Sequence, residues 1–182
     1  MDDIVKQAMA KWPNVPDCYG WLGLDARGNW YMRDDQAQAR GAFASGQAGA
    51  KGSMLQHAKL IEFIERNYGC DAVGRWFFQN GPQRVYVELE ATPKIWRIDG
   101  LGAISSNAGE IAQFERCLMD EHGWAYLQTS AGFGLVHTQD VAALATAIEQ
   151  RGWAVEEARA ADLPQRFAYC VSPQAQHAQA TP

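Results

Sequence analysis

Three Gly-Trp pairs recur along this chain, each after a stretch with a helical pattern and each at the start of a strand-like run. They are Gly20-Trp21, Gly123-Trp124 and Gly152-Trp153, and a fourth strand-like run begins at Trp76, two residues after Gly74. With seven Trp and 17 Gly in 182 residues, chance placement would give fewer such pairs. The spacing therefore predicts one supersecondary element that is used several times. A large indole at the start of each hairpin would anchor it on its helix and bury about 150–250 Å².

Hydrophobic periodicity predicts four units, each a helix followed by a β-hairpin. The expected helices cover residues 2–12, 53–68, 110–118 and 140–148. The expected hairpins pair 19–24 with 29–32, 75–78 with 84–90, 124–128 with 135–137, and 153–158 with 166–171, and an extra strand covers 94–98. Helices interleaved with short hairpins predict an α+β fold with mainly antiparallel sheets.

Segments rich in glycine and small polar residues indicate where the chain divides. The stretch 99–108 is rich in Gly and Ser, which predicts an N-terminal half over residues 1–99 and a C-terminal half over 100–171. Residues 172–182 are expected to form a disordered polar tail. Residues 35–52 contain several glycines and few large apolar side chains, so we expect a mobile loop there.

The end of that loop has some features of a phosphate-binding loop. Backbone N–H groups ahead of a helix can bind an anion, and Lys51 would add positive charge. A P-loop places Lys directly before Ser or Thr, whereas Gly52 separates Lys51 from Ser53 in this chain. The sequence therefore favours a flexible linker over a phosphate site.

Composition argues against several classes of function. The net charge of −5 and the scattered Lys and Arg residues disfavour a protein that binds nucleic acid through its phosphates. No apolar run approaches the roughly 18 residues of a membrane span and no secretory signal pattern is present, so we expect a cytoplasmic protein without membrane contact. The four cysteines lie far apart, and no His stands near them at metal-ligand spacing. This pattern predicts reduced core thiols, with no metal and no cofactor.

Three segments of the first hundred residues carry a resemblance to known proteins. They are Trp21–Trp30, Leu60–Ile64 and Thr92–Ile98. In these segments the chain resembles a family of small proteobacterial proteins of unknown function that are built from repeated hairpin and helix motifs. The resemblance implies such a fold and a ligand-binding role in a signalling context. The Gly- and Ala-rich insertion at 41–52 departs from the family pattern.

A group of polar side chains on the second hairpin is the most site-like feature of the sequence. Tyr86, Glu88 and Glu90 share one face of their strand. Arg97 and Asp99 would share that face if the strand 94–98 returned antiparallel beside it. Paired carboxylates next to an arginine suit a polar ligand, although cross-strand ion pairs on a solvent face need the same residues.

Three histidines are candidate general bases, namely His57, His122 and His137. None is accompanied in sequence by a nucleophile motif or by a second histidine at metal spacing. His137 is the best placed of them, because it lies between a strand and the cap of the next helix. The predicted ligand-binding residues are therefore Tyr86, Glu88, Arg97 and His137.

Two functional hypotheses follow from these features. The first is a non-enzymatic module that binds a small polar ligand or a partner protein in a groove between the two halves, in regulation or signalling. The second is a small hydrolase or transferase that uses His137 with a carboxylate. The missing catalytic motifs favour the first hypothesis.

Overall fold

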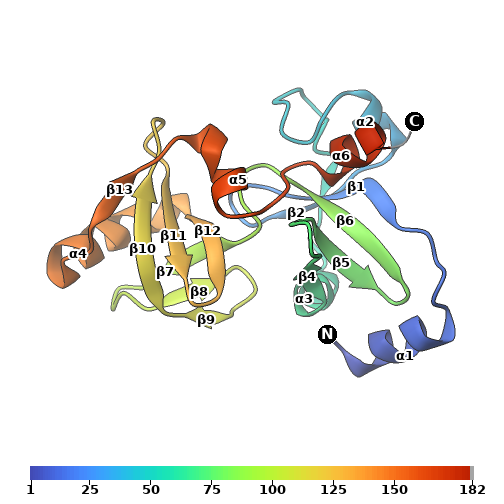
Figure 1. The fold of residues 1–182 in the computed structure, drawn as a ribbon, viewed down its shortest axis with the longest axis horizontal. Coiled ribbons are helices and arrows are strands. Elements are labelled where there is room, and N and C mark those ends of the chain that lie inside the picture. Colours follow the sequence, from blue (N-terminus) through green and yellow to red (C-terminus); the bar gives the residue numbers. More distant parts are fainter. Residues whose placement is uncertain (181–182) are drawn as a thin grey trace. The chain divides into compact units, whose positions relative to one another are not determined.

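The computed structural model describes residues 1–180, and these residues form two compact units that are each organised around one β-sheet (Figure 1). Unit 1 contains Met1–Asp25, Asn29–Glu90 and the chain from Tyr169 onward. Unit 2 contains Ala26–Gly28 and Ala91–Ala168. Helices and sheets are both present and partly interleaved, which confirms the predicted α+β class. The sheets are mixed, however, because each contains parallel as well as antiparallel pairs.

Unit 1 has a six-stranded sheet in the order β3-β2-β1-β6-β5-β4. Its strands are β1 (Cys18–Leu24), β2 (Trp30–Met32), β3 (Ser53–Met54), β4 (Tyr68–Cys70), β5 (Trp76–Asn80) and β6 (Gln83–Leu89). Its helices are α1 (Asp3–Lys11), α2 (Asp35–Ala39), α3 (Ala58–Arg66) and α6 (Pro173–Ala180). The predicted hairpins β1/β2 and β5/β6 are antiparallel, and the two hairpins meet through a parallel pairing of β1 with β6.

One face of this sheet is covered by α3. Phe78 and Val85 are cross-strand neighbours on that face, and the ring of Phe63 from α3 meets Phe78 edge to face at 5.5 Å. The helix begins later than predicted, because Ser53 lies in β3 and His57 provides the N-cap. The His57 Nδ1 accepts a hydrogen bond from the Leu60 N–H, which satisfies one of the amides left open at a helix start.

The opposite face is covered in part by residues 34–52, and the prediction of an unanchored loop there is wrong. Phe43 and Ala50 are each only 1% exposed, and the Phe43 ring lies against the Cα of Gly23. A Cβ at Gly23 would come within 2.4 Å of that ring, so only glycine permits this contact. Two buried apolar side chains, Phe43 and Ala50, therefore anchor a segment that is otherwise mostly polar.

Arg33 also holds the 34–52 segment in place, through hydrogen bonds to its backbone. Its side chain is 1% exposed, and its guanidinium donates to the carbonyl oxygens of Ala50 at 2.9 Å, Gly41 at 2.6 Å and Gly20 at 3.2 Å. Lys51 is also engaged, because its ammonium pairs with Glu90 at 2.6 Å. The pairing gives Lys51 a structural partner and removes support for a phosphate loop.

The predicted disordered tail is instead a helix over its described part. Residues 173–180 form α6, which packs on β1 and β6 on the same face as the 34–52 segment. The Leu89 N–H donates to the Val171 carbonyl at 2.9 Å, so the chain just before α6 continues the hydrogen bonding at the end of β6.

Unit 2 has a seven-stranded sheet in the order β13-β10-β11-β12-β7-β8-β9. Its strands are β7 (Ile95–Ile98), β8 (Ile104–Ser106), β9 (Ile111–Ala112), β10 (Phe114–Met119), β11 (Ala125–Thr129), β12 (Gly132–Val136) and β13 (Val155–Glu157). Its helices are α4 (Val141–Arg151) and α5 (Leu163–Arg166), with 3₁₀ turns η1 (Thr138–Asp140) and η2 (Ala160–Asp162). The predicted hairpin β11/β12 is antiparallel, and Gly152 ends α4 in the left-handed conformation at φ +66°.

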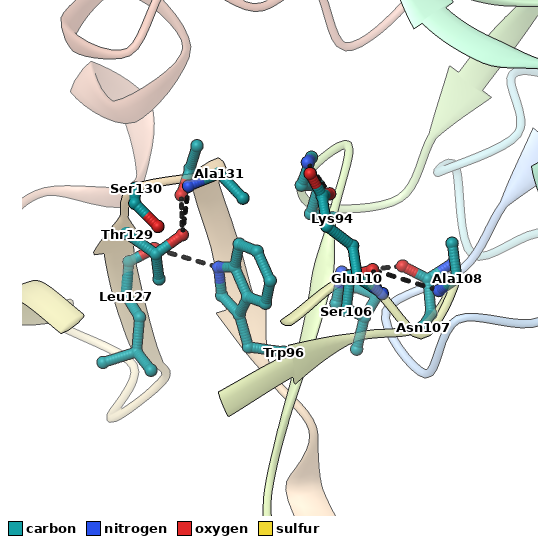
Figure 2. A network of polar contacts seen from close by, with 12 residues as sticks. Lys94, Trp96, Ser106, Asn107, Ala108, Glu110, Leu127, Thr129, Ser130 and Ala131 are labelled. Carbon is teal, nitrogen blue, oxygen red and sulfur yellow. Dashed lines mark hydrogen bonds and ion pairs between the residues drawn. The ribbon is translucent and has the colours of Figure 1, made fainter. Parts of the chain in front are cut away.

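The core of unit 2 is built around Trp96, which is fully buried against α4 and the sheet. Its indole Nε1 donates to the Leu127 carbonyl at 3.1 Å (Figure 2). Gly134 makes room for this arrangement, because a Cβ there would lie 2.4 Å from the Lys94 oxygen and 2.8 Å from the indole nitrogen. Two further contacts hold the ends of the neighbouring strands: Thr129 Oγ1 accepts from the Ala131 N–H, and Lys94 pairs with Glu110.

The predicted helix 110–118 is wrong, since this segment forms β9 and β10. Cys117 and Leu118 are adjacent and both fully buried, whereas Glu115 and Arg116 before them are both exposed, so burial along this strand does not alternate. Such a strand loses the alternation that distinguishes it from a helix, so its periodicity misled the prediction.

The fourth predicted hairpin is also wrong. β13 pairs in parallel with β10, and residues 166–171 contain the end of α5 followed by chain without a strand. Three of the four hairpins are therefore confirmed, while the fourfold helix–hairpin repeat is not.

The segment 94–98 is a strand as predicted, but its neighbours differ from those expected. β7 lies between β12 and β8 in unit 2 and not beside β6. The chain passes from unit 1 to unit 2 after Glu90, whereas the sequence predicts the boundary between the two halves at 99–108. Asp99 closes a tight turn there, because its Oδ1 accepts from the N–H groups of Leu101 and Ala103. A Gly-rich stretch thus marks a hairpin turn inside unit 2.

The four cysteines are unpaired thiols in different surroundings. Cys117 is fully buried, and burial raises the pKa of its thiol to about 11. Cys70 is exposed, while Cys18 and Cys170 are partly buried. The expectation of core thiols thus holds fully for Cys117 alone.

Candidate functional site

Tyr86, the first predicted ligand residue, lies in the interior of unit 1 with 0% exposure. Its ring stacks on Tyr19 at 4.7 Å, and the guanidinium of Arg75 lies 4.8 Å from the ring centre. The phenol donates to Asp71 at 3.2 Å and accepts from Arg75 at 3.3 Å. Every part of this side chain thus has a partner within unit 1.

Glu88 lies on the same face of β6 and is 2% exposed. Its two oxygens accept hydrogen bonds from the Ser172 hydroxyl at 2.5 Å and from the Gln174 N–H at 2.9 Å. Burial raises the pKa of this carboxyl, while the two hydrogen bonds and the nearby Arg33 act in the opposite direction. Glu88 therefore holds the start of α6.

Arg97 and His137 lie in unit 2, where Asp140 connects them. The Arg97 guanidinium forms two hydrogen bonds with Asp140, from Nε to Oδ2 at 2.5 Å and from a terminal nitrogen to Oδ1 at 3.1 Å. His137 caps η1, with its Nδ1 accepting from the Gln139 N–H at 3.1 Å. The Arg97 hydrogen bonds lower the pKa of Asp140, and the charge of His137 contributes to the same effect.

The four predicted residues therefore fall into two pairs, one in each unit. Tyr86 and Glu88 share a face of β6, as the alternation of that strand predicts. Arg97 does not join them through a shared sheet, because β7 belongs to unit 2. Each of the four already has a hydrogen-bonding partner from the chain.

Asp140 provides a test of the structural role of the Arg97 pair. Since its pKa is lowered in the folded chain, its stabilising effect is present above its unfolded pKa of about 3.9 and is lost as the pH falls through the folded pKa. Asp140→Asn is expected to lower the free energy of unfolding at pH 7 by about 1–2 kcal/mol and to flatten its decline below pH 4. Urea unfolding at pH 7 and pH 3 measures both effects, with Glu149→Gln on the exposed side of α4 as the control.

An open pocket of about 890 Å³ lies in unit 2 and has no counterpart in the sequence-based candidates. Its apolar walls come from Met119 of β10, Val155 of β13 and Leu163 at the start of α5. Six charged residues surround these walls: Asp120, Glu121, Glu157, Arg159, Asp162 and Arg166. Charged residues thus outnumber apolar ones in the lining, which makes this pocket more polar than most small-ligand sites and suits a ligand that carries charge.

Three of these charged residues are already used by the fold. Asp120 accepts hydrogen bonds from the Trp124 N–H at 2.9 Å and from the Tyr126 hydroxyl at 2.8 Å. Glu121 accepts from the Ala160 N–H at 2.9 Å, and this bond lowers the pKa of the carboxyl. Arg166 pairs with Glu156 at 2.7 Å.

The other three charged residues of the pocket are available to a ligand. Over residues 1–180, no ion pair is formed by Glu157, Arg159 or Asp162. The arginine offers five N–H donors to a carboxylate, and the two acidic side chains offer acceptors to an ammonium group. The pocket thus presents positively and negatively charged side chains beside the apolar walls formed by Met119, Val155 and Leu163.

Sequence reasoning missed this pocket because residues 159–166 were assigned to a hairpin. A signal was present in the spacing of Arg159, Asp162 and Arg166, which are three and four residues apart, as charged side chains on one side of a helical segment are. The segment in fact contains η2 and α5.

A second cavity of about 280 Å³ lies in unit 1 between α3 and the sheet. Its walls are almost entirely apolar and include Trp21, Met32 and Phe63. Trp21 and Met32 are 41% and 52% exposed, so this cavity opens at the surface of unit 1.

Two further features of residues 1–180 bear on the kind of site. No helix there is both long enough and apolar enough to cross a bilayer. No group of three or more His, Cys, Asp or Glu side chains in that range is arranged to hold a metal ion.

Comparison with known proteins gives a family but no activity. A crystal structure of a DUF1285 family protein from Silicibacter pomeroyi DSS-3 is similar at 13% sequence identity and a TM-score of 0.48. The match covers 79% of this chain and 83% of that one. No curated protein matches the sequence. A family model does match residues 1–176, and the chain therefore belongs to the family DUF2944, described as "Protein of unknown function (DUF2946)".

Proposed function

We propose that the protein is a non-enzymatic binding module that takes a small polar ligand in the pocket of unit 2. The observation that supports this most concerns Glu157, Arg159 and Asp162. These three residues have no ion-pair partner in residues 1–180, and they line the pocket together with apolar side chains. Ionised side chains of both signs beside an apolar surface suit a zwitterion with an apolar body. An amino acid with a large aliphatic or aromatic side chain, or a short peptide, has this chemistry. A module of this kind fits a regulatory role.

The alternative of a hydrolase or transferase has less support. His137 is 8% exposed, and its Nδ1 is occupied by the cap of η1. A general base needs access to the proton that it removes, and a nucleophile within reach. Asp140, the nearest carboxylate to be considered, is held by Arg97 and by the Ile98 N–H at 3.0 Å.

Calorimetry with leucine and phenylalanine tests the proposed function. The matched competitors are the N-acetyl amides, which keep the apolar body but lack both charges. We expect the free amino acids to bind and the capped forms to bind at least roughly tenfold more weakly, because charged hydrogen bonds contribute about 1.5–3 kcal/mol each. A ligand at about 100 times its Kd should stabilise the chain by about 2.7 kcal/mol and raise its Tm by roughly 5–10 °C.

The variant Arg159→Gln should remove this ligand-dependent rise in Tm without lowering the Tm of the unliganded protein. Arg116→Gln is the matched control, because Arg116 is an exposed arginine of β10 outside the pocket. Equal binding of free and capped amino acids, or a rise in Tm that survives Arg159→Gln, would contradict the proposed site.

A further inference from the structure

The C-terminal segment of unit 1 is attached to the sheet mainly by hydrogen bonds and by one aromatic contact. We call residues 171–180, which include α6, the C-terminal strap. Pro173 is the only buried residue of α6, and residues 175–180 are all exposed. An isolated helix of eight residues is not stable in water, so the strap depends on the surface beneath it.

That surface, which we call the cradle, consists of Tyr19, Arg33, Gln38 and Glu88. The Ser172 hydroxyl and the Gln174 N–H donate to Glu88. The Gln174 side chain donates to Gln38 at 2.8 Å and accepts from Arg33 at 3.4 Å. Three residues of the cradle, Glu88, Gln38 and Arg33, thus bind Ser172 and Gln174 at the start of the strap.

An aromatic contact completes the interaction further along α6. The imidazole of His177 lies parallel to the Tyr19 ring at 4.1 Å, with an interplanar angle of 3°. Tyr19 in turn lies on Tyr86. The strap therefore presents a hydroxyl, an open helix-start N–H, a primary amide and an imidazole, and the cradle has a complementary group for each.

The cradle is positioned by parts of unit 1 other than the strap. Three backbone carbonyls hold Arg33, and Tyr19 rests on Tyr86, which Arg75 and Asp71 fix in turn. Gly20 leaves the space that Gln174 occupies, because a Cβ there would come within 2.4 Å of its amide nitrogen. A preformed surface of buried polar groups covered by an exposed polar helix has the character of a binding site and its ligand.

We propose that the C-terminal strap is an exchangeable ligand of the cradle: it opens from its own chain, and the vacated cradle binds the strap of a second copy. The sequence that the cradle recognises is carried by the chain itself, which makes a second copy the partner whose chemistry fits. Exchange of an identical element between copies needs no new contact. This proposal concerns unit 1 and is independent of the ligand proposed for unit 2.

The test uses the full chain and a fluorescein-labelled peptide with the sequence of residues 171–180. In the wild type the strap of the same chain competes, so the apparent Kd of the peptide is weakened by the small fraction of open chains. The double variant Ser172→Ala/His177→Ala weakens the attached strap and leaves the cradle intact. It should therefore bind the wild-type peptide at least roughly tenfold more tightly than the wild-type chain does, by fluorescence anisotropy.

Cradle variants in the same double-variant background show whether the peptide occupies the cradle. Glu88→Gln and Tyr19→Leu should each weaken peptide binding at least roughly fivefold, while Glu62→Gln, at an exposed position of α3, should leave it unchanged. Hydrogen exchange at β6 verifies that each variant keeps its sheet.

The proposal is overturned if the double variant binds the peptide no better than the wild type, because α6 is then a fixed part of unit 1. It is equally overturned if both cradle variants retain full binding, since the peptide then lies elsewhere. Binding to the double variant that is lost with either cradle substitution supports it.

Discussion

Arg33→Ala is expected to lower the free energy of unfolding by about 3–5 kcal/mol, the largest effect of any single substitution considered for this chain. The guanidinium is 1% exposed and serves the carbonyls of Gly20, Gly41 and Ala50. Alanine would leave these oxygens without their donor, and each unsatisfied buried group costs about 1–3 kcal/mol. Urea unfolding measures the loss.

The same variant should expose the segment that Arg33 holds. Trypsin is expected to cut after Arg40 and Lys51 early in Arg33→Ala and late in the wild type, because opening of the segment controls access to both bonds. Arg33→Lys should fall between the two, since an ammonium keeps the charge but lacks the planar fork that reaches three acceptors.

Arg40→Ala is the control for stability, since Arg40 is exposed and its side chain donates one hydrogen bond within residues 1–180, to the Ala48 carbonyl at 3.4 Å. A loss of less than about 1 kcal/mol in Arg33→Ala would contradict the assigned role of the buried guanidinium.

Gly134→Ala is expected to lower the free energy of unfolding by about 2–3 kcal/mol. The new methyl group would overlap the Lys94 carbonyl and the Trp96 indole nitrogen, at 2.4 Å and 2.8 Å. The carbonyl belongs to the backbone of the neighbouring segment, so it moves only if the pairing of β12 with β7 shifts. Urea unfolding measures this effect as well.

Gly100→Ala is the matched control in the same unit. Apart from its chain neighbours, no atom of residues 1–180 lies within 4 Å of the position that its Cβ would occupy, and its φ is not in the left-handed region. We expect a change within about 0.5 kcal/mol of the wild type. Equal losses for the two glycine variants would show that crowding around Trp96 is not what requires glycine at position 134.

Local patterns predicted the hairpins well, and the reason lies in their turns. The β5/β6 hairpin has Gly81 at φ +57° before a strand in which Val85, Val87 and Leu89 alternate with polar residues, and Gly28 at φ +80° serves the β1/β2 turn. A turn of this kind depends on residues that are neighbours in sequence. The α+β class followed from such local signals, and the shared face of Tyr86 and Glu88 followed from alternation.

The features that sequence did not predict depend on contacts between distant segments. Phe43 anchors the 34–52 segment only because Gly23, twenty residues earlier, leaves space for its ring. The strand β10 resembles a helix in sequence because its buried residues do not alternate with exposed ones. Which strands join in parallel, such as β1 with β6, depends on long-range packing that a local window does not contain.

The candidate pocket escaped prediction for a related reason. Its walls come from β10, β13 and α5, so its lining is assembled from residues between Met119 and Arg166. The charged residues that it exposes looked like ordinary solvated residues of a turn. Only their position around Leu163 distinguishes them.

Unit 1 is formed from chain segments that are translated before and after unit 2, so its sheet is completed last during synthesis. Unit 2 is nearly continuous, from Ala91 to Ala168, whereas unit 1 also needs the chain from Tyr169 onward. The Leu89 N–H cannot form its hydrogen bond until Val171 has been translated. Glu88 likewise lacks its donors until Ser172 and Gln174 follow, 84 and 86 residues later. On the ribosome, all of unit 2 is therefore translated while the first sheet still has an exposed aromatic and acidic face. That face receives its last contacts only when Ser172, Gln174 and His177 have been translated and can reach Glu88 and Tyr19.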